Sequence, residues 1–326
     1  MEKQTKRWIA AGTLTAGAVT AGVVAHEVTK YLMAMALDRQ KPRSIVNSEK
    51  ARQKIRGTDY QQQFLEDLEV CAENLKAQPT QRVEIQSRDG LCLVGHLRTC
   101  PHPKRLVVAM HGWRSSWDQD FGMIADFLYR SGCTVLYAEQ RGQNDSGGDH
   151  MGFGMLERFD CADWANWMHD NVSSTMPMYL IGISMGASTV LMATGLPLPQ
   201  NVKGVAADCG YTSPKAIWKH ITEDNLHMSY GFHRLDIEEL CRRKIQMGPS
   251  DYTTIEALEQ NTIPVLLIHG TDDSFVPVEM TYENYKACRG PRKLLIVPGA
   301  DHGMSYYVDR ENYEKAILDF TQACER

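Results

Sequence analysis

YLIGISMG, at residues 179–186, joins two segments of different character. The apolar residues 178–183 predict a buried strand, and the small and apolar residues 185–193 predict a helix that begins at once. A strand that turns directly into a helix strains the backbone of the residue at the junction, here Ser184. The glycines on either side of it lack Cβ atoms and therefore fit so tight a turn. This stretch predicts one strand–helix unit of an α/β sheet.

The pattern G-x-S-x-G at this junction indicates a nucleophile elbow. The turn lifts the Ser184 hydroxyl clear of the sheet and places it at a helix N-terminus, where free N–H groups favour negative charge. A serine that only caps the helix is the alternative, because a pattern with three fixed positions also matches unrelated sequences. The chemical interpretation therefore depends on finding a base and an acid elsewhere in the chain.

Short apolar strands alternate with helices on both sides of this unit, which predicts a mostly parallel central sheet with helices on both faces. Asp89 and Gly90 form a predicted hairpin turn, which adds antiparallel strands at one edge. Residues 211–260 break the alternation with two predicted helices and no convincing strand. An insertion of that length predicts a helical lid. Further strands are predicted at 82–87, 91–98, 105–110, 133–138, 202–208, 264–269 and 293–297, and further helices at 60–77, 121–130, 157–171, 278–287 and 312–324.

The composition is that of an ordinary globular enzyme, with 43% apolar and 23% charged residues in a chain of 326. A net charge of −5 gives no reason to expect nucleic acid as a partner. The nine cysteines are scattered and never form C-x-x-C, so the usual zinc spacings are excluded and a reduced state is favoured. We expect neither a metal nor a cofactor.

Residues 1–37 form a hydrophobic N-terminal segment in which residues 8–25 are uncharged. Crossing a membrane takes about 20 mostly apolar residues, and this run reaches that length only with weakly hydrophobic Ala, Gly and Thr. Three interpretations stay open: a retained signal anchor, a signal peptide cleaved near residues 23–25, and a helix packed on the protein surface. We expect membrane association through this single segment. Basic residues flank it on both sides, so the side of the membrane is undetermined. A basic linker and a helix follow at 38–79.

A base and an acid are found after the last two predicted strands, where His302 lies in one loop and the acid, Asp272 or Asp273, lies in the other. Parallel strands bring their carboxyl ends to one edge of the sheet, so both side chains can meet Ser184 there. The chain order Ser, Asp, His is the one expected for this elbow. Asp272 and Asp273 are adjacent candidates for the acid, and Asp208, after the strand that follows the elbow, is an alternative position for it.

The negative charge of an acyl-transfer intermediate also needs hydrogen-bond donors. The backbone N–H of Met185 follows the nucleophile directly, and the N–H of Trp113 lies in the loop after the strand at 105–110. Seven large side chains fit a substrate pocket and plain lid packing equally well: Trp113, Trp117, Phe153, Trp218, Met228, Tyr230 and Phe232.

Four motifs in this order resemble the α/β-hydrolase family over about residues 80–325: HGW at 111–113, GISMG at 182–186, HGTDD at 269–273 and ADHG at 300–303. The resemblance implies the α/β-hydrolase fold. Its pattern H-G-x-x-D-x-x-V-P selects Asp273 as the acid. DCGYTS at 208–213 is similar to a bacterial subgroup with a hydrophobic N-terminal segment, esterase-like or serine-aminopeptidase-like. EQRG at 139–142 resembles the family's D-x-R-G turn, with Glu in place of Asp, and is interpreted as structural.

We therefore expect a serine hydrolase that cleaves carboxylic esters through an acyl-enzyme, with Ser184 as nucleophile, His302 as base and Asp273 orienting the base. The expected partner is a small ester or acyl substrate, and the oligomeric state is not indicated. Peptidase, thioesterase and acyltransferase activities use the same acyl-enzyme and stay open. An inactive, membrane-tethered binding protein is the alternative of another class, because a fold alone does not fix a function.

Overall fold

The computed structural model describes residues 22–40 and 59–326, and its centre is an eight-stranded sheet in the order β1-β2-β4-β3-β5-β6-β7-β8. β2 pairs antiparallel with β1 and with β4, and the other neighbouring strands are parallel. The predicted α/β class with an antiparallel edge is confirmed. The strands are β1 Gln81–Gln86, β2 Cys92–Arg98, β3 Arg105–Met110, β4 Cys133–Ala138, β5 Met178–Ile183, β6 Val202–Asp208, β7 Val265–Gly270 and β8 Arg292–Val297.

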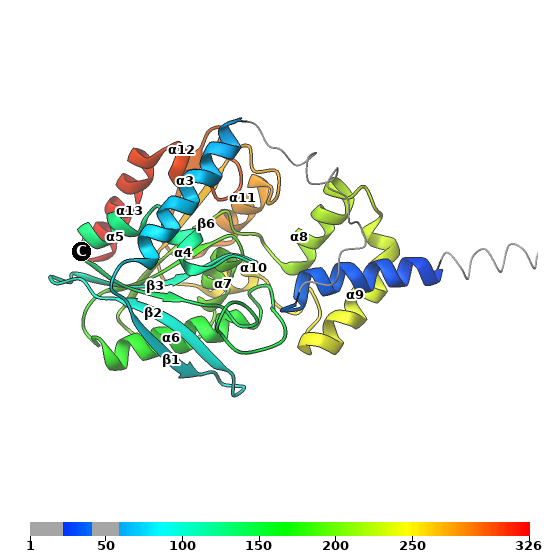
Figure 1. The fold of residues 1–326 in the computed structure, drawn as a ribbon, viewed down its shortest axis with the longest axis horizontal. Coiled ribbons are helices and arrows are strands. Elements are labelled where there is room, and N and C mark those ends of the chain that lie inside the picture. The colour runs from blue at the N-terminus through cyan, green and yellow to red at the C-terminus, as the bar shows by residue number, and fades with distance from the viewer. Residues whose placement is uncertain (1–21, 41–58) are drawn as a thin grey trace, which may run out of the picture.

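Helices cover both faces of this sheet because its strands are apolar on both sides (Figure 1). On β3, Leu106 and Val108 face one apolar cluster, whereas Val107 and Ala109 face a second cluster on the other side of the sheet. The helices are α3 Asp59–Lys76, α4 Trp117–Phe121, α5 Ala125–Arg130, α6 Glu157–Asn171, α7 Met185–Ala193, α8 Pro214–His220, the π-helix η1 Ile221–Asn225, α9 Tyr230–Ile245, α10 Thr254–Gln260, α11 Val278–Ala287, α12 Ser305–Val308 and α13 Arg310–Cys324.

The helices differ from the prediction in several places. Of the segment predicted as one helix at 121–130, only residues 125–130 form α5, because residues 122–124 are a turn and Phe121 ends the separate helix α4. α9 begins before the predicted boundary. α10 was not predicted, although Thr253 and Glu256 form the capping box that starts it.

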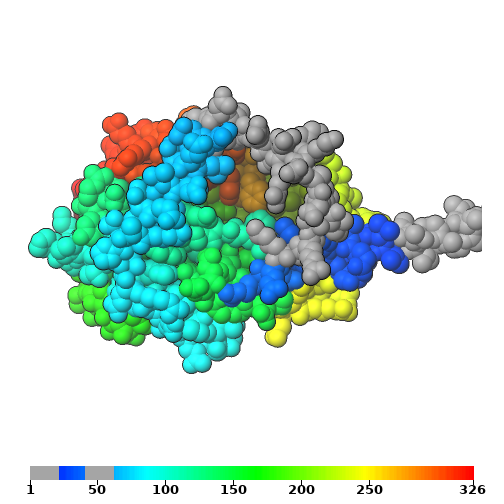
Figure 2. Space-filling view, in the orientation of Figure 1, coloured from blue at the N-terminus to red at the C-terminus, as the bar shows by residue number. Residues whose placement is uncertain are grey.

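The lid helices α8, η1 and α9 stand over the carboxyl edge of the sheet, and a helix of residues 22–37 packs among them (Figure 1). In the space-filling view this N-terminal helix lies against α9 (Figure 2). Thr29, Met33 and Leu37 are its buried face, at 1%, 3% and 0% exposure. Residues 22–37 therefore form a helix that packs on the protein.

Most of the uncharged run at 8–25 lies outside the described residues. Within 22–40 and 59–326, the structure contains no helix with both the length and the apolar character needed to cross a bilayer.

Candidate active site

Ser184 occupies the sharp junction between β5 and α7, with φ 56° and ψ −116°. A residue other than glycine rarely adopts this conformation, so the surrounding structure must hold it in place. The flanking glycines explain how the surrounding structure holds Ser184 in this conformation. A Cβ on Gly186 would lie 1.9 Å from the carbonyl oxygen of Met110, and one on Gly182 would lie 2.1 Å from the carbonyl oxygen of Gly186. The elbow therefore packs directly against β3, and only hydrogen atoms fit at those two positions.

The structure brings Ser184, His302 and Asp273 together at the carboxyl edge of the sheet. Nε2 of His302 lies 2.9 Å from Oγ of Ser184, and its Nδ1 lies 2.8 Å from Oδ2 of Asp273. A carboxylate only accepts, so Nδ1–H donates to Asp273 and Nε2 is left to accept the proton of the Ser184 hydroxyl. This is the tautomer in which an imidazole can act as a base toward serine.

Asp273 is held rigidly by its own loop. Its Oδ1 accepts backbone N–H groups from Phe275 at 2.9 Å and Val276 at 2.8 Å. Nε2 of His269 lies 3.0 Å from its Oδ2 and 2.9 Å from the carbonyl oxygen of Val276, so that nitrogen carries the proton and donates. Burial raises the pKa of the Asp273 carboxyl, but hydrogen bonds from His269 and His302 lower it, with a net fall below the ordinary value. Asp273 is therefore ionised at neutral pH.

The other two candidate acids lie elsewhere. Asp272 is exposed and accepts a hydrogen bond from the Thr271 hydroxyl at 2.7 Å. Asp208 is buried and accepts from the Ser305 hydroxyl at 3.0 Å, and burial raises the pKa of its carboxyl. Of the three candidate acids, Asp273 is the one whose carboxylate is hydrogen-bonded to the imidazole of His302.

Cys209 is a neighbour of His302 that sequence reasoning missed. Its sulfur lies within 4.8 Å of ligand atoms of both Asp273 and His302. Burial raises the pKa of the Cys209 thiol to about 11, so it stays protonated at neutral pH and is not a strong nucleophile. Burial lowers the pKa of His302, whereas Cys209 and Asp273 raise it, with a net rise well above the ordinary value. Of the two groups that raise it, the Asp273 carboxylate is the one that carries a charge at neutral pH.

The loop after β3 lies against the elbow, since a Cβ on Gly112 would come within 3.3 Å of Cβ of Ser184. Asp120, which the sequence did not single out, fixes this loop by accepting hydrogen bonds from the Gly112 N–H and the Ser115 hydroxyl. Trp113 follows in the same loop, and Met185 is the first residue of α7. Within the described chain, neither of their backbone N–H groups has a protein acceptor. Both donors are therefore available to a bound oxyanion.

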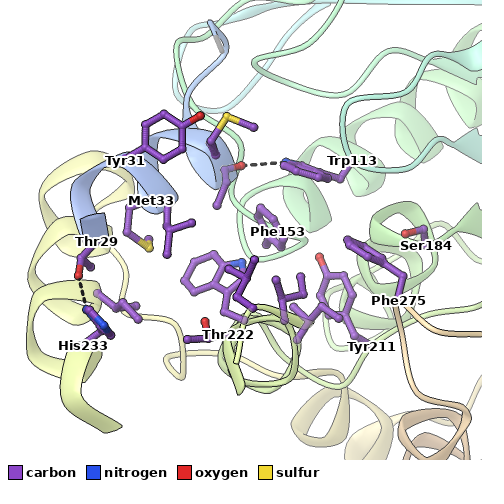
Figure 3. Close-up of a pocket in the computed structure, with 18 residues that line it drawn as sticks. Thr29, Tyr31, Met33, Trp113, Phe153, Ser184, Tyr211, Thr222, His233 and Phe275 are labelled. Atoms are coloured by element: carbon purple, nitrogen blue, oxygen red, sulfur yellow. Dashed lines mark hydrogen bonds between the residues drawn. The ribbon is translucent and has the colours of Figure 1, made fainter. Parts of the chain in front are cut away.

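A cavity of about 260 Å³ opens beside Ser184 and runs under the lid (Figure 3). Ser184 lines one end of the cavity, and Thr29 and His233 line the other end (Figure 3). Of the seven large side chains considered for a pocket, the cavity is lined by Trp113, Phe153 and Trp218. Trp117 and Tyr230 are instead buried in packing, and Phe232 is exposed. The lining contains no Asp, Glu, Lys or Arg.

Comparisons with known proteins agree with this architecture. The family described as the prolyl oligopeptidase family matches residues 119–325, more than half of the chain. Solved structures of similar fold include the esterase Pf2001 of Pyrococcus furiosus, with a TM-score of 0.61 and 20% identity, covering 77% of this chain and 93% of that one. This likeness confirms the predicted α/β-hydrolase fold.

Two curated relatives are similar in sequence. The uncharacterised protein YqkD of Bacillus subtilis is 27% identical over 194 residues, which are 58% of this chain and 62% of the relative. The bifunctional esterase/perhydrolase DCH of Acinetobacter calcoaceticus is 33% identical over 79 residues, which are 24% of this chain and 28% of the relative. The chain thus spans less than two thirds of the length of these relatives.

Proposed function

The chain belongs to the prolyl oligopeptidase family and is a serine hydrolase of the α/β-hydrolase type, and we propose that it cleaves carboxylic esters through an acyl-enzyme on Ser184. The observation that carries this proposal is the unbroken hydrogen-bond chain from the Ser184 hydroxyl through His302 to the Asp273 carboxylate, at 2.9 Å and 2.8 Å. A serine with its base and orienting acid already in contact needs little rearrangement before it reacts.

In the proposed reaction, Oγ of Ser184 attacks the ester carbonyl carbon while Nε2 of His302 takes its proton. The carbonyl oxygen becomes an oxyanion that accepts hydrogen bonds from the backbone N–H groups of Trp113 and Met185, each worth about 3 kcal/mol in the transition state. Collapse breaks the bond to the alcohol oxygen, which receives the proton from Nε2. Water, deprotonated by His302, then cleaves the acyl-enzyme and releases the acid.

The pocket favours an ester over a peptide with a free terminus. A peptide amine or carboxylate that is buried must be paired with an opposite charge, because desolvation of an isolated ion is costly. The lining beside Ser184 has no side chain with a fixed charge. Because the matching family is described by a peptidase, peptides are the second candidate substrate. Aminoacyl and peptidyl anilides are therefore included in the test.

The test is labelling with a fluorophosphonate probe followed by turnover of esters and anilides. We expect Ser184→Ala to abolish labelling and to lower ester turnover by about 10⁴-fold or more. Ser174→Ala, on the exposed loop before β5, is the matched control and should label like the wild-type protein. Undiminished labelling of Ser184→Ala would overturn the proposal. Faster turnover of anilides than of esters would favour the peptidase.

We further propose that the protein attaches to a membrane through its N-terminal segment. Large apolar side chains are exposed at the start of the helix at 22–37 and on α9, including Val23 at 59%, Phe232 at 68% and Leu235 at 73%. Contact with a bilayer removes this apolar surface from water, which favours attachment. Recovery of the full-length protein in a carbonate-washed membrane fraction is expected, and full recovery in the supernatant would contradict it.

A further inference from the structure

The pocket beside Ser184 is closed by a part of the chain far from the hydrolase motifs. Six of its lining residues come from the N-terminal helix: Thr29, Tyr31, Leu32, Met33, Met35 and Ala36. The opposite wall comes from the lid, including Ile217, Trp218 and Ile237. Residues 22–37, which pack between the lid and the loop after β3, therefore form one wall of the pocket.

The C-terminal end of this helix is bound to the loop that carries the proposed oxyanion donor. The indole Nε1–H of Trp113 donates to the carbonyl oxygen of Ala36 at 2.9 Å. The guanidinium of Arg114 donates to the carbonyl oxygens of Met35 at 2.8 Å and Asp38 at 2.6 Å. Cations and N–H donors at a helix C-terminus are favourable, so these contacts hold the helix end in place.

The remainder of the helix is bound to α9. Nδ1 of His233 lies 2.7 Å from Oγ1 of Thr29, whose hydroxyl donates to the carbonyl oxygen of Ala25 at 2.8 Å. Because the Thr29 proton is used in that bond, Nδ1–H of His233 is the donor to Thr29. His26 and Asp236 make a second contact at 3.1 Å. The Thr29–His233 pair closes the far end of the pocket with polar groups that already satisfy each other.

From this arrangement we infer that the N-terminal helix sets the substrate class: an ester with an uncharged, unbranched apolar group of medium length, which lies between residues 32–36 and the lid. The inference rests on the proposed function. An engineered cavity of about 150 Å³ holds benzene, with its six carbons. By that measure the cavity of about 260 Å³ accommodates an apolar group of about ten carbons.

The experiment is a chain-length series of p-nitrophenyl esters from acetate to palmitate, measured as kcat/KM on the full-length protein. Each methylene that enters the pocket should raise kcat/KM about fourfold, until the pocket is filled at about ten carbons. Leu32→Trp narrows the pocket and should lower the decanoate rate about tenfold or more with little effect on acetate. Met33→Ala widens the pocket, so kcat/KM should go on increasing up to esters about three carbons longer than in the wild type.

Lys30→Ala is the control on the exposed side of the same helix, and its profile should match the wild type. Thermal unfolding checks that each variant is folded, and Met33→Ala carries the test if Leu32→Trp is not. A profile that is the same in both pocket variants and the wild type overturns the inference. If Ser184 still labels with the fluorophosphonate in that case, the proposed function stands. If Ser184 does not label in the wild type, the proposed function fails and the inference with it.

Discussion

Nδ1 of His302 lies 2.8 Å from Oδ2 of Asp273, whereas the adjacent Asp272 is turned toward the Thr271 hydroxyl. The two carboxylates are neighbours in sequence, and only one of them holds the imidazole. We expect Asp273→Asn to lower kcat about 10⁴-fold, because an amide in that position no longer selects the tautomer that accepts the serine proton. Asp272→Asn is the matched control and should retain kcat within about threefold, as is usual for exposed substitutions. A large loss in Asp272→Asn with a small one in Asp273→Asn would reverse the assignment.

The pH dependence of turnover should report the environment of His302. The pKa of its imidazole is raised above the ordinary value of 6.5, and only the neutral form can take the serine proton. Activity should therefore fall as the pH is lowered through a midpoint above 6.5. Replacing the Asp273 carboxylate by an amide removes one of the groups that raise the pKa of His302, so the midpoint in Asp273→Asn should move down. The profile of kcat/KM against pH in both proteins checks this, and an unchanged midpoint would contradict it.

Much of the catalytic centre could be predicted because its signals are local in sequence. The elbow is a strand–turn–helix pattern of eight residues, and the loops of Asp273 and His302 directly follow predicted strands. Parallel pairing then brings such loops to one edge without knowledge of any side-chain contact.

The surface on which the N-terminal helix packs could not be predicted in the same way. Its position depends on pairs such as Thr29 with His233, which are 204 residues apart. Hydropathy describes how apolar such a segment is and says nothing about which surface it covers. Asp120 is a similar case, because an acidic residue in a predicted loop is usually solvated, and only the fold reveals its bond to the Gly112 N–H.

Gly112 provides a test of how closely the oxyanion loop must fit the elbow. A Cβ at this position would lie 3.3 Å from Cβ of Ser184 and 3.1 Å from Oδ2 of Asp120. Gly112→Ala should therefore displace the loop by a fraction of an ångström and lower kcat about tenfold to a hundredfold, because small displacements of reacting groups are costly. Gly231→Ala, on α9 with only Oγ of Ser229 nearby at 3.8 Å, is the control and should leave kcat unchanged. Equal kcat in Gly112→Ala and the wild type would contradict the close fit.

Arg141 joins the turn after β4 to α6 through a buried ion pair. Its Nε and Nη2 donate to the two oxygens of Asp160, each at 2.6 Å, and its Nη1 donates to Asp89 at 2.7 Å. The Arg141 and Asp160 side chains are 5% and 2% exposed, so removing the guanidinium leaves a buried carboxylate without its charge partner. We expect Arg141→Ala to lower the free energy of unfolding by about 3–5 kcal/mol.

A second ion pair to α6, between Arg88 and Asp163, is the comparison for the loss of stability expected in Arg141→Ala. Arg88 donates to Asp163 at 3.0 Å, but its side chain is 51% exposed, so water already solvates the charge. Arg88→Ala should cost only about 0–1 kcal/mol. Denaturant unfolding of the two variants and the wild type, followed by tryptophan fluorescence, measures the difference. Equal losses would mean that water reaches Asp160 when Arg141 is removed, and the turn would then be held by its backbone hydrogen bonds rather than by the buried pair.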